Sequence, residues 1–393
     1  MAKTKPAKTK KESKKRQANP SLNKGLEIRS PAFLLESASQ SLQLGNVEAA
    51  LPVAKQALDL LQAGATESLP ALNLLGQIYI ELGDIELARQ YFQKAVTIDK
   101  EGTVCDEDGG GAEKFLWLAQ LSEEGGNDSV SWFEKAATIL RRQIQNLLSH
   151  KPHITEEHQA LLTEKTRKLA GALCSLVEVY MTDLSWEEDA ESICETLITE
   201  ATMVAPDFAE PWQTLANVRI SQNRMADAQA ALKRSLDLWK GLPLQDPNVP
   251  EFSTRVSLAR LLLEADMDEE AIDVLEFLIS ENDSSVEAWY LGGWGLYIMG
   301  EKQKSQIEDD KSHRETWQRS WMFSRQWLNQ ALHLFDQQNY EDERLGEHTR
   351  ELLKTLNAEL GTECKIDDKI EGLEDNEWSD VEESDKDEPM ACI

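Results

Sequence analysis

The segment from Ala71 to Ala95 constrains the fold of this chain more than any other part of the sequence. Apolar and small residues recur in it at the three- and four-residue spacing of a helical face, Gly83 interrupts them, and a second face follows. The first face holds Leu72, Leu75, Gly76 and Tyr79, and the second holds Ala88, Phe92 and Ala95. Because small residues let helices approach closely while aromatic rings fill the space beside them, the segment predicts two packed helices joined by a turn.

The same spacing recurs along the chain and becomes less regular. Further copies cover residues 34–57, 115–136, 173–190, 212–232 and 259–278, and a last copy begins at Trp289 with its second helix displaced to 324–331. A lone helix pair cannot bury its apolar face, whereas stacked pairs can. This periodicity is typical of tetratricopeptide repeats, and an ordinary helical bundle would lack it. We therefore predict an all-α fold, a right-handed superhelical solenoid of about seven such repeats.

Charge divides the chain into three parts. Residues 1–29 are basic with almost nothing apolar, and residues 361–393 are acidic, so we expect both tails to be disordered. Residues 30–360 form the predicted solenoid, with polar insertions near 149–158 and 301–316 and a C-terminal capping helix at 341–360. Thr155 is placed to cap the helix after the first insertion. We expect Trp317, Trp321 and Trp327 to pack the end of the solenoid rather than bind a ligand.

Motifs for catalysis and for cofactor binding are missing from the sequence. It contains no phosphate-binding loop, no His-Glu-x-x-His, no Gly-x-Ser-x-Gly and no Cys-x-x-Cys. The glycines at 109–111 follow three acidic residues, which is wrong for a phosphate cradle. His150, His153 and His158 lie in a loop and at a helix start without a metal-ligand motif. We therefore predict a protein that is not an enzyme and binds no cofactor or metal.

Cysteine usage and hydropathy indicate where the protein resides. Its five cysteines are scattered and odd in number, which suits a reducing compartment. No apolar run approaches the roughly 20 residues that span a bilayer. The lysine-rich start also lacks the apolar core of a signal peptide. We expect a soluble intracellular protein that does not contact membranes.

The predicted function lies in the surface of the stacked repeats. The first helix of each pair lines a concave groove, and its exposed face is one residue away from the core positions. Carboxylates on that face pair with Lys or Arg, amides hold an extended backbone, and aromatic rings stack on guanidinium groups. The predicted client-binding residues are Gln77, Glu81, Glu113, Gln120, Glu123, Glu124, Glu178, Glu210, Gln213, Asn217, Glu264, Glu287, Tyr290, Trp294 and Tyr297.

The net charge of −30 is far more than the acidic tail supplies, so the helical body is itself acidic. An acidic body repels nucleic acid and attracts basic polypeptide. We therefore expect a basic protein partner and no direct nucleic-acid binding by the body. The alternative is that the charge only keeps a large helical protein soluble.

The chain also resembles a known family. A lysine-rich start, degenerate repeats with the sequence EGGNDSVSWFEKA at 124–136, and an Asp/Glu-rich end containing Glu377-Trp378 are similar to the fungal dedicated assembly chaperones of the fourth large-subunit ribosomal protein. The resemblance covers the architecture of the whole chain. It implies a non-catalytic protein that holds the long internal loop of the new ribosomal protein in its groove. It also implies that the protein escorts this client from cytoplasm to nucleus for release at the pre-60S particle.

Two further questions stay open at this level. Lys10, Lys11, Lys14, Lys15 and Arg16 are a candidate nuclear import signal for an import receptor, but the same arm equally suits folding back on the acidic body or touching ribosomal RNA. The competing functional class is a tetratricopeptide-repeat scaffold or adaptor subunit of a multi-protein complex, which needs no basic client.

Overall fold

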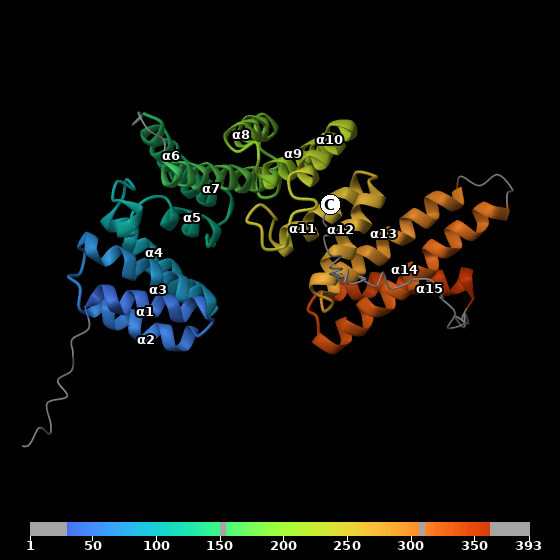
Figure 1. Ribbon diagram of the computed structural model, residues 1–393, viewed down its shortest axis with the longest axis horizontal. Coiled ribbons are helices and arrows are strands. Elements are labelled where there is room, and N and C mark those ends of the chain that lie inside the picture. Colours follow the sequence, from blue (N-terminus) through green and yellow to red (C-terminus); the bar gives the residue numbers. More distant parts are fainter. Residues whose placement is uncertain (1–29, 150–154, 306–310, 362–393) are drawn as a thin grey trace, which may run out of the picture. The chain divides into compact units, whose positions relative to one another are not determined.

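The computed structural model describes residues 30–149, 155–305 and 311–361, and for 311–315 only the backbone. Within these residues the chain forms fifteen α-helices and no strand (Figure 1), which confirms the predicted all-α fold. The α-helices are α1 Pro31–Gln43, α2 Val47–Asp59, α3 Leu69–Glu81, α4 Ile85–Ile98, α5 Glu113–Gln120, α6 Gly126–Ser149, α7 Glu156–Met181, α8 Ala190–Val204, α9 Ala209–Ser221, α10 Met225–Asp237, α11 Phe252–Glu264, α12 Asp268–Glu281, α13 Val286–Ser305, α14 Lys311–Gln338 and α15 Glu343–Leu360. Two short 3-10 helices are η1 Thr66–Ser68 and η2 Asp106–Asp108.

The chain divides into two compact units, Met1–Val218 (unit 1) and Arg219–Ile393 (unit 2). In unit 1, α1 packs with α2, α3 with α4, α5 with α6, and α7 with α8. In unit 2, α11 packs with α12 and α13 with α14, and α15 lies against both α13 and α14. These six pairs are the ones that the spacing predicts, whereas the pair predicted at 212–232, α9 and α10, spans the point at which the chain divides into its two units. The predictions for the basic arm and for the tail after Gly361 lie outside the described residues.

The pair α3/α4 shows why small residues recur in the repeat. Gly76 lies directly under the ring of Phe92, and a Cβ at this position would overlap that ring. Phe92 is fully buried. Gly83 ends the first helix with a φ of +76°, a conformation that glycine adopts without strain. Asp84 then caps α4 by accepting a hydrogen bond from the backbone N–H of Leu87.

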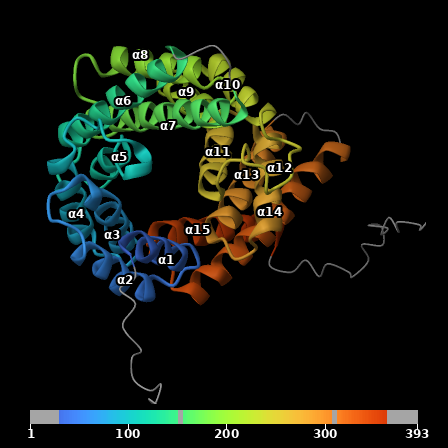
Figure 2. The same ribbon diagram turned by 60° about the vertical axis from the view of Figure 1, so that its left-hand side comes forward.

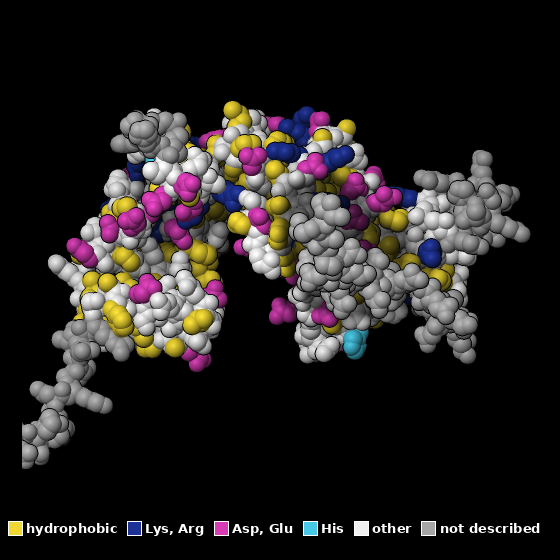
Figure 3. Space-filling model, viewed as in Figure 1, with side chains coloured by type: hydrophobic (Ala, Val, Ile, Leu, Met, Phe, Trp, Pro, Cys, Tyr) yellow, Lys and Arg dark blue, Asp and Glu magenta, His cyan; other side chains and the backbone are white. Residues whose placement is uncertain are grey.

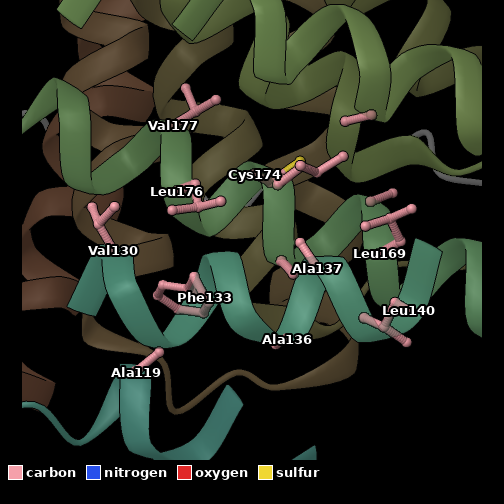
Figure 4. Packing of buried hydrophobic residues seen from close by; sticks show 14 of the residues in the cluster. Ala119, Val130, Phe133, Ala136, Ala137, Leu140, Leu169, Cys174, Leu176 and Val177 are labelled. Atoms are coloured by element: carbon pink, nitrogen blue, oxygen red, sulfur yellow. The ribbon is translucent and has the colours of Figure 1, made fainter. Parts of the chain in front are cut away.

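The largest core in unit 1 lies among α5, α6, α7 and α8. Figure 4 shows side chains of α6, among them Phe133, Ala136 and Leu140, meeting side chains of α7 such as Leu169 and Leu176. All five are almost fully buried. The helices approach closely at alanines, and larger side chains fill the space beside them, as the repeat pattern predicts.

The first predicted insertion falls between α6 and α7. The second, at 301–316, is wrong over most of its length, because residues 301–305 continue α13 and residues 311–316 begin α14. Thr155 caps α7 as predicted, because its hydroxyl accepts a hydrogen bond from the backbone N–H of His158 at 3.2 Å. In unit 2, Trp317 and Trp321 are buried and pack with side chains of α15, as expected for the end of a solenoid. Trp327 lies directly over Gly292 of α13, where a Cβ would collide with its ring.

The loop between α4 and α5 is held by a buried ion pair that the sequence did not reveal. Lys114 donates to Asp99 at 2.9 Å and to the carbonyl of Gly111 at 2.8 Å, and the side chains of Lys114 and Asp99 are 0% and 2% exposed. The second oxygen of Asp99 accepts the backbone N–H of Thr103. Burial raises the pKa of Asp99, but the hydrogen bonds from Lys114 and Thr103 outweigh it and leave that pKa below its usual value. Asp99 is therefore ionised at neutral pH. Burial lowers the pKa of Lys114, and its hydrogen bond to Asp99 opposes that change.

Two features are absent from the described part of the chain. No helix there combines the length and apolar character that crossing a membrane requires. No group of three or more His, Cys, Asp or Glu side chains there has the arrangement of a metal site.

Candidate functional site

The first helices of unit 1 form its inner face. In Figure 2 the helix pairs of this unit follow an arc, with α1, α3, α5 and α7 on the inner side and their partners outside. The first helices of the first two pairs, α1 and α3, also contact each other. We call the surface of α3, α5, α7 and the start of α9, with the turn after α5, the inner face. It carries the predicted groove residues of unit 1.

The exposed members of this set lie mainly at helix ends. Glu81 ends α3, Glu113 and Gln120 begin and end α5, and all three side chains are exposed. Gln77 is half-buried on α3, one turn before Glu81. Figure 3 shows Asp and Glu side chains gathered over the α4–α6 region on the face in view. This part of unit 1 therefore presents mostly negative charge.

Two of the predicted carboxylates of unit 1 are already paired. Glu113 of α5 accepts an ion pair from Lys168 of α7 at 3.4 Å, and Lys168 also pairs with Glu164 at 3.0 Å. Burial lowers the pKa of Lys168, but these two carboxylates outweigh it and leave the pKa raised. Glu123, in the turn after α5, pairs with Arg89 of α4. The sequence missed both partners because each comes from a neighbouring repeat.

Glu178 of α7 is the most distinctive acid of the inner face. Its side chain is exposed, yet burial by the surrounding protein raises the pKa of its carboxyl group. Nearby protein therefore removes part of the water around this carboxyl group although the side chain still reaches solvent. Burial also raises the pKa of the nearby Cys174 thiol to about 12, and Glu210 and Glu178 add to that rise. The two carboxylates therefore lie close to one point between α7 and α9.

The remaining residues of unit 1 differ in accessibility. Glu124 is exposed in the turn beside Glu123, and no ion pair of Glu124 occurs within the described residues. Gln213 of α9 is only 9% exposed, and Asn217 is half-buried. The accessible charge on the inner face therefore comes chiefly from carboxylates, and the amides of α9 contribute less surface than their spacing predicts.

In unit 2 the predicted aromatic residues lie on α13 and pack against other helices. Tyr290 hydrogen-bonds His348 of α15 at 2.8 Å, and Trp294 meets the edge of the same ring. Tyr297 stacks on Trp321 of α14. All three predicted residues remain half-buried, so each still exposes part of its ring. Their contact with a client stays a prediction.

The two predicted carboxylates of unit 2 lie on neighbouring first helices. Glu264 is exposed at the end of α11. Glu287, near the start of α13, pairs with Arg260 of α11. The candidate import signal at residues 10–16 lies outside the described residues.

The helix pairs define a tetratricopeptide-repeat protein. The tetratricopeptide repeat family model matches residues 69–101. The chain is 46% identical over its whole length to a probable assembly chaperone of rpl4 from Emericella nidulans, all of which is covered. It is 34% identical to a protein of the same name from Schizosaccharomyces pombe, over 86% of this chain and 94% of that one.

A solved structure agrees with these relatives. It is the structure of an assembly chaperone of RpL4 (Acl4), residues 1–338, which is 55% identical in sequence to this chain and superimposes with a TM-score of 0.65. The match covers 70% of this chain and 99% of the chain in that structure. The chain belongs to the same family as these proteins, the assembly chaperones of rpl4.

Proposed function

We propose that the inner face captures a basic segment of newly made rpl4 and keeps that protein soluble until assembly. The observation that carries the proposal is the pair of carboxylates Glu178 and Glu210, which both lie near Cys174 on the inner face of a chain with a net charge of −30. Relatives named as probable assembly chaperones of rpl4 support the choice of client. The repeat fold and the chaperone name of these relatives favour a role without catalysis.

The chemistry of capture follows from charge. A protein segment shaped to meet ribosomal RNA carries Lys and Arg, and before assembly those side chains lack a counter-charge. The inner face supplies carboxylates, which steer a basic chain toward it and pair with it. A Lys or Arg of the client should stabilise the charged form of Glu178 most, because the surrounding protein removes water from this carboxylate without supplying a positive charge.

The same chemistry provides a route for release. RNA presents one phosphate per nucleotide, and it binds the same Lys and Arg side chains. At the pre-60S particle these phosphates compete with the carboxylates of the inner face. A client held mainly by exposed ion pairs is therefore released without any chemical step.

The route to the nucleus completes the proposal. The protein binds its client in the cytoplasm, and Lys10, Lys11, Lys14, Lys15 and Arg16 serve an import receptor. Replacing these five residues with Ser should then shift a fluorescent fusion toward the cytoplasm while rpl4 binding is kept. Unchanged nuclear accumulation would reject this signal.

A pair of matched variants tests capture. The Glu124→Lys/Glu178→Lys variant reverses two exposed acids of the inner face, and Glu48→Lys/Glu276→Lys reverses two exposed acids on the second helices α2 and α12. Removing two attractive contacts of up to about 1 kcal/mol each should weaken rpl4 binding about tenfold or more. The control variant should bind within about twofold of wild type, because charges distant from the client are screened.

The results separate the proposal from its alternative. Equal weakening in both double variants would show that net charge, rather than the inner face, attracts the client. Affinity purification from growing cells provides the second readout. One dominant basic partner supports the chaperone, whereas a stable set of neutral partners would support a scaffold or adaptor subunit.

A further inference from the structure

A cavity lies where the first helices α1 and α3 begin, away from the carboxylates of the inner face. Its volume is about 710 Å³. Its apolar walls come from Pro31 and Leu35 of α1, Leu61 after α2, Pro70 of α3, and Val104 in the loop before α5. Cavities of this size accommodate several side chains.

The walls of this cavity are held firmly. Asn73 donates a hydrogen bond to the carbonyl of Gly109 at 2.8 Å. Gly109 has a φ of +76° and lies so close to Pro70 that a Cβ would collide with that backbone. The buried pair of Asp99 and Lys114 fixes the two ends of the same loop. The cavity is therefore preformed rather than a gap between mobile parts.

The basic arm joins the folded chain at the rim of this cavity. Ser30 and Pro31, the first folded residues, line it. Ser30 is extended, with φ −61° and ψ 149°, where the chain enters α1. Consecutive residues of an extended chain advance by about 3.4 Å, so Ile28 and Leu26 lie within about 7 Å and 14 Å of Ser30. Both can reach the cavity without any rearrangement of the repeat.

The residues before Ser30 match the cavity in chemistry. Leu26 and Ile28 are two apart, so in an extended chain both side chains point to one face. Glu67 and Asp108 are exposed at the cavity walls, and the arm holds eight Lys and two Arg against only two Glu. An apolar pair inside a basic segment fits an apolar cavity with acidic walls.

We propose that residues 24–29 of this chain dock in the cavity, with Leu26 and Ile28 against its apolar walls and Lys24 and Arg29 near Glu67 and Asp108. Docking covers apolar surface that the first two repeats and the loop before α5 leave accessible. It also anchors the rest of the arm at this edge of unit 1. The five basic residues at 10–16 then extend from a fixed point.

The alkylation rate of Cys105 reports on docking, because this side chain is exposed and lines the cavity. The full chain is treated with iodoacetamide, and the alkylation of each cysteine is followed by mass spectrometry. In wild type the docked segment should slow alkylation of Cys105. The Leu26→Asp/Ile28→Asp variant should react about tenfold faster, which corresponds to about 1.4 kcal/mol favouring the docked state.

A matched control uses the same arm. Ala7→Asp/Ala18→Asp makes the same change of charge outside residues 24–29 and should leave the Cys105 rate unchanged. Cys364 is an internal reference for reagent activity. A synthetic peptide of residues 20–30, added to the Leu26→Asp/Ile28→Asp chain, should restore the slow rate.

A positional readout supports the kinetic one. Under mild oxidation Ile28→Cys should form a disulfide with Cys105, whereas Ala18→Cys should not. Equal Cys105 rates in wild type and Leu26→Asp/Ile28→Asp, without that disulfide, would overturn the proposal. Protection that appears only when rpl4 is added would likewise overturn it, because the cavity would then serve the client.

Discussion

The buried pair of Lys114 and Asp99 gives the most direct prediction about stability. Lys114→Met keeps a long unbranched side chain but removes the ammonium group, so it leaves a buried carboxylate without its cation. Breaking a buried ion pair in this way costs about 3–5 kcal/mol. Because Asp99 keeps its hydrogen bond from Thr103, we expect the low end of that range, about 3 kcal/mol. For a unit of this size, about 3 kcal/mol lowers Tm by roughly 6–12 °C.

The pH dependence of this effect has a definite sign. In wild type the pKa of Asp99 is below its usual value, so its contribution to stability is complete above that usual value and is lost as pH falls through the folded pKa. In Lys114→Met, burial without a cation raises the pKa of Asp99, so stability falls as pH rises. The difference in Tm between the two proteins should therefore be larger at about pH 8 than at about pH 5.5.

Thermal unfolding followed by circular dichroism measures this difference. Lys135→Met is the matched control, because it removes an exposed ion pair. The side chain of Lys135 is 35% exposed, and that of its partner Glu101 is 69% exposed. That exposed pair should contribute at most about 1 kcal/mol. The double variant Lys114→Met/Asp99→Leu should recover much of the loss, because it leaves no unpaired charge. If Lys114→Met lowers Tm no more than Lys135→Met, the reasoning about the buried pair is refuted.

Three further predictions concern the repeat packing, the contact between Tyr290 and His348 in unit 2, and Glu178 of the inner face. Gly76→Ala should lower the free energy of unfolding in urea by about 1–3 kcal/mol, because the added Cβ overlaps the ring of Phe92. Gly171 has open space around it, so Gly171→Ala should raise that free energy by up to about 1 kcal/mol. Equal effects of the two substitutions would contradict the packing described for Gly76. Tyr290→Phe should lower the Tm slightly, because it removes a hydrogen bond to His348 that contributes about 1 kcal/mol to stability. In a protein that already carries His348→Phe, the same Tyr290→Phe change should have no further effect on the Tm. Glu178→Gln should raise Tm at about pH 8, where the raised pKa makes the charged form unfavourable, while weakening rpl4 binding; a loss of both would assign Glu178 a structural role.

The helix pairs were predictable because their signal is local. Gly76, Phe92 and the turn at Gly83 lie within one repeat, and the spacing of small and apolar residues directly specifies which faces pack. The same reasoning located Trp317 and Trp321 in the end of the solenoid. In each case the contacting residues belong to one helix or to adjacent helices.

The state of individual site residues was less predictable, because it depends on contacts between repeats. Glu123 looks like a free acid in the sequence, but Arg89 from the previous repeat pairs with it. Tyr290 looks like an exposed groove residue, but His348 from α15 lies against it. The pair of Asp99 and Lys114 spans a glycine-rich loop with no helical period, so no pattern indicated it.

The central claim is that carboxylates of the inner face hold a basic segment of rpl4. The most direct measurement is the Kd of the full chain for purified rpl4 between about 0.1 M and 1 M salt, over which the Debye length falls from about 10 Å to 3 Å. We predict that wild type weakens at least about tenfold across this range and that Glu124→Lys/Glu178→Lys starts weaker and weakens less. A wild-type Kd that does not change with salt, or a double variant with the same salt dependence, would contradict the account.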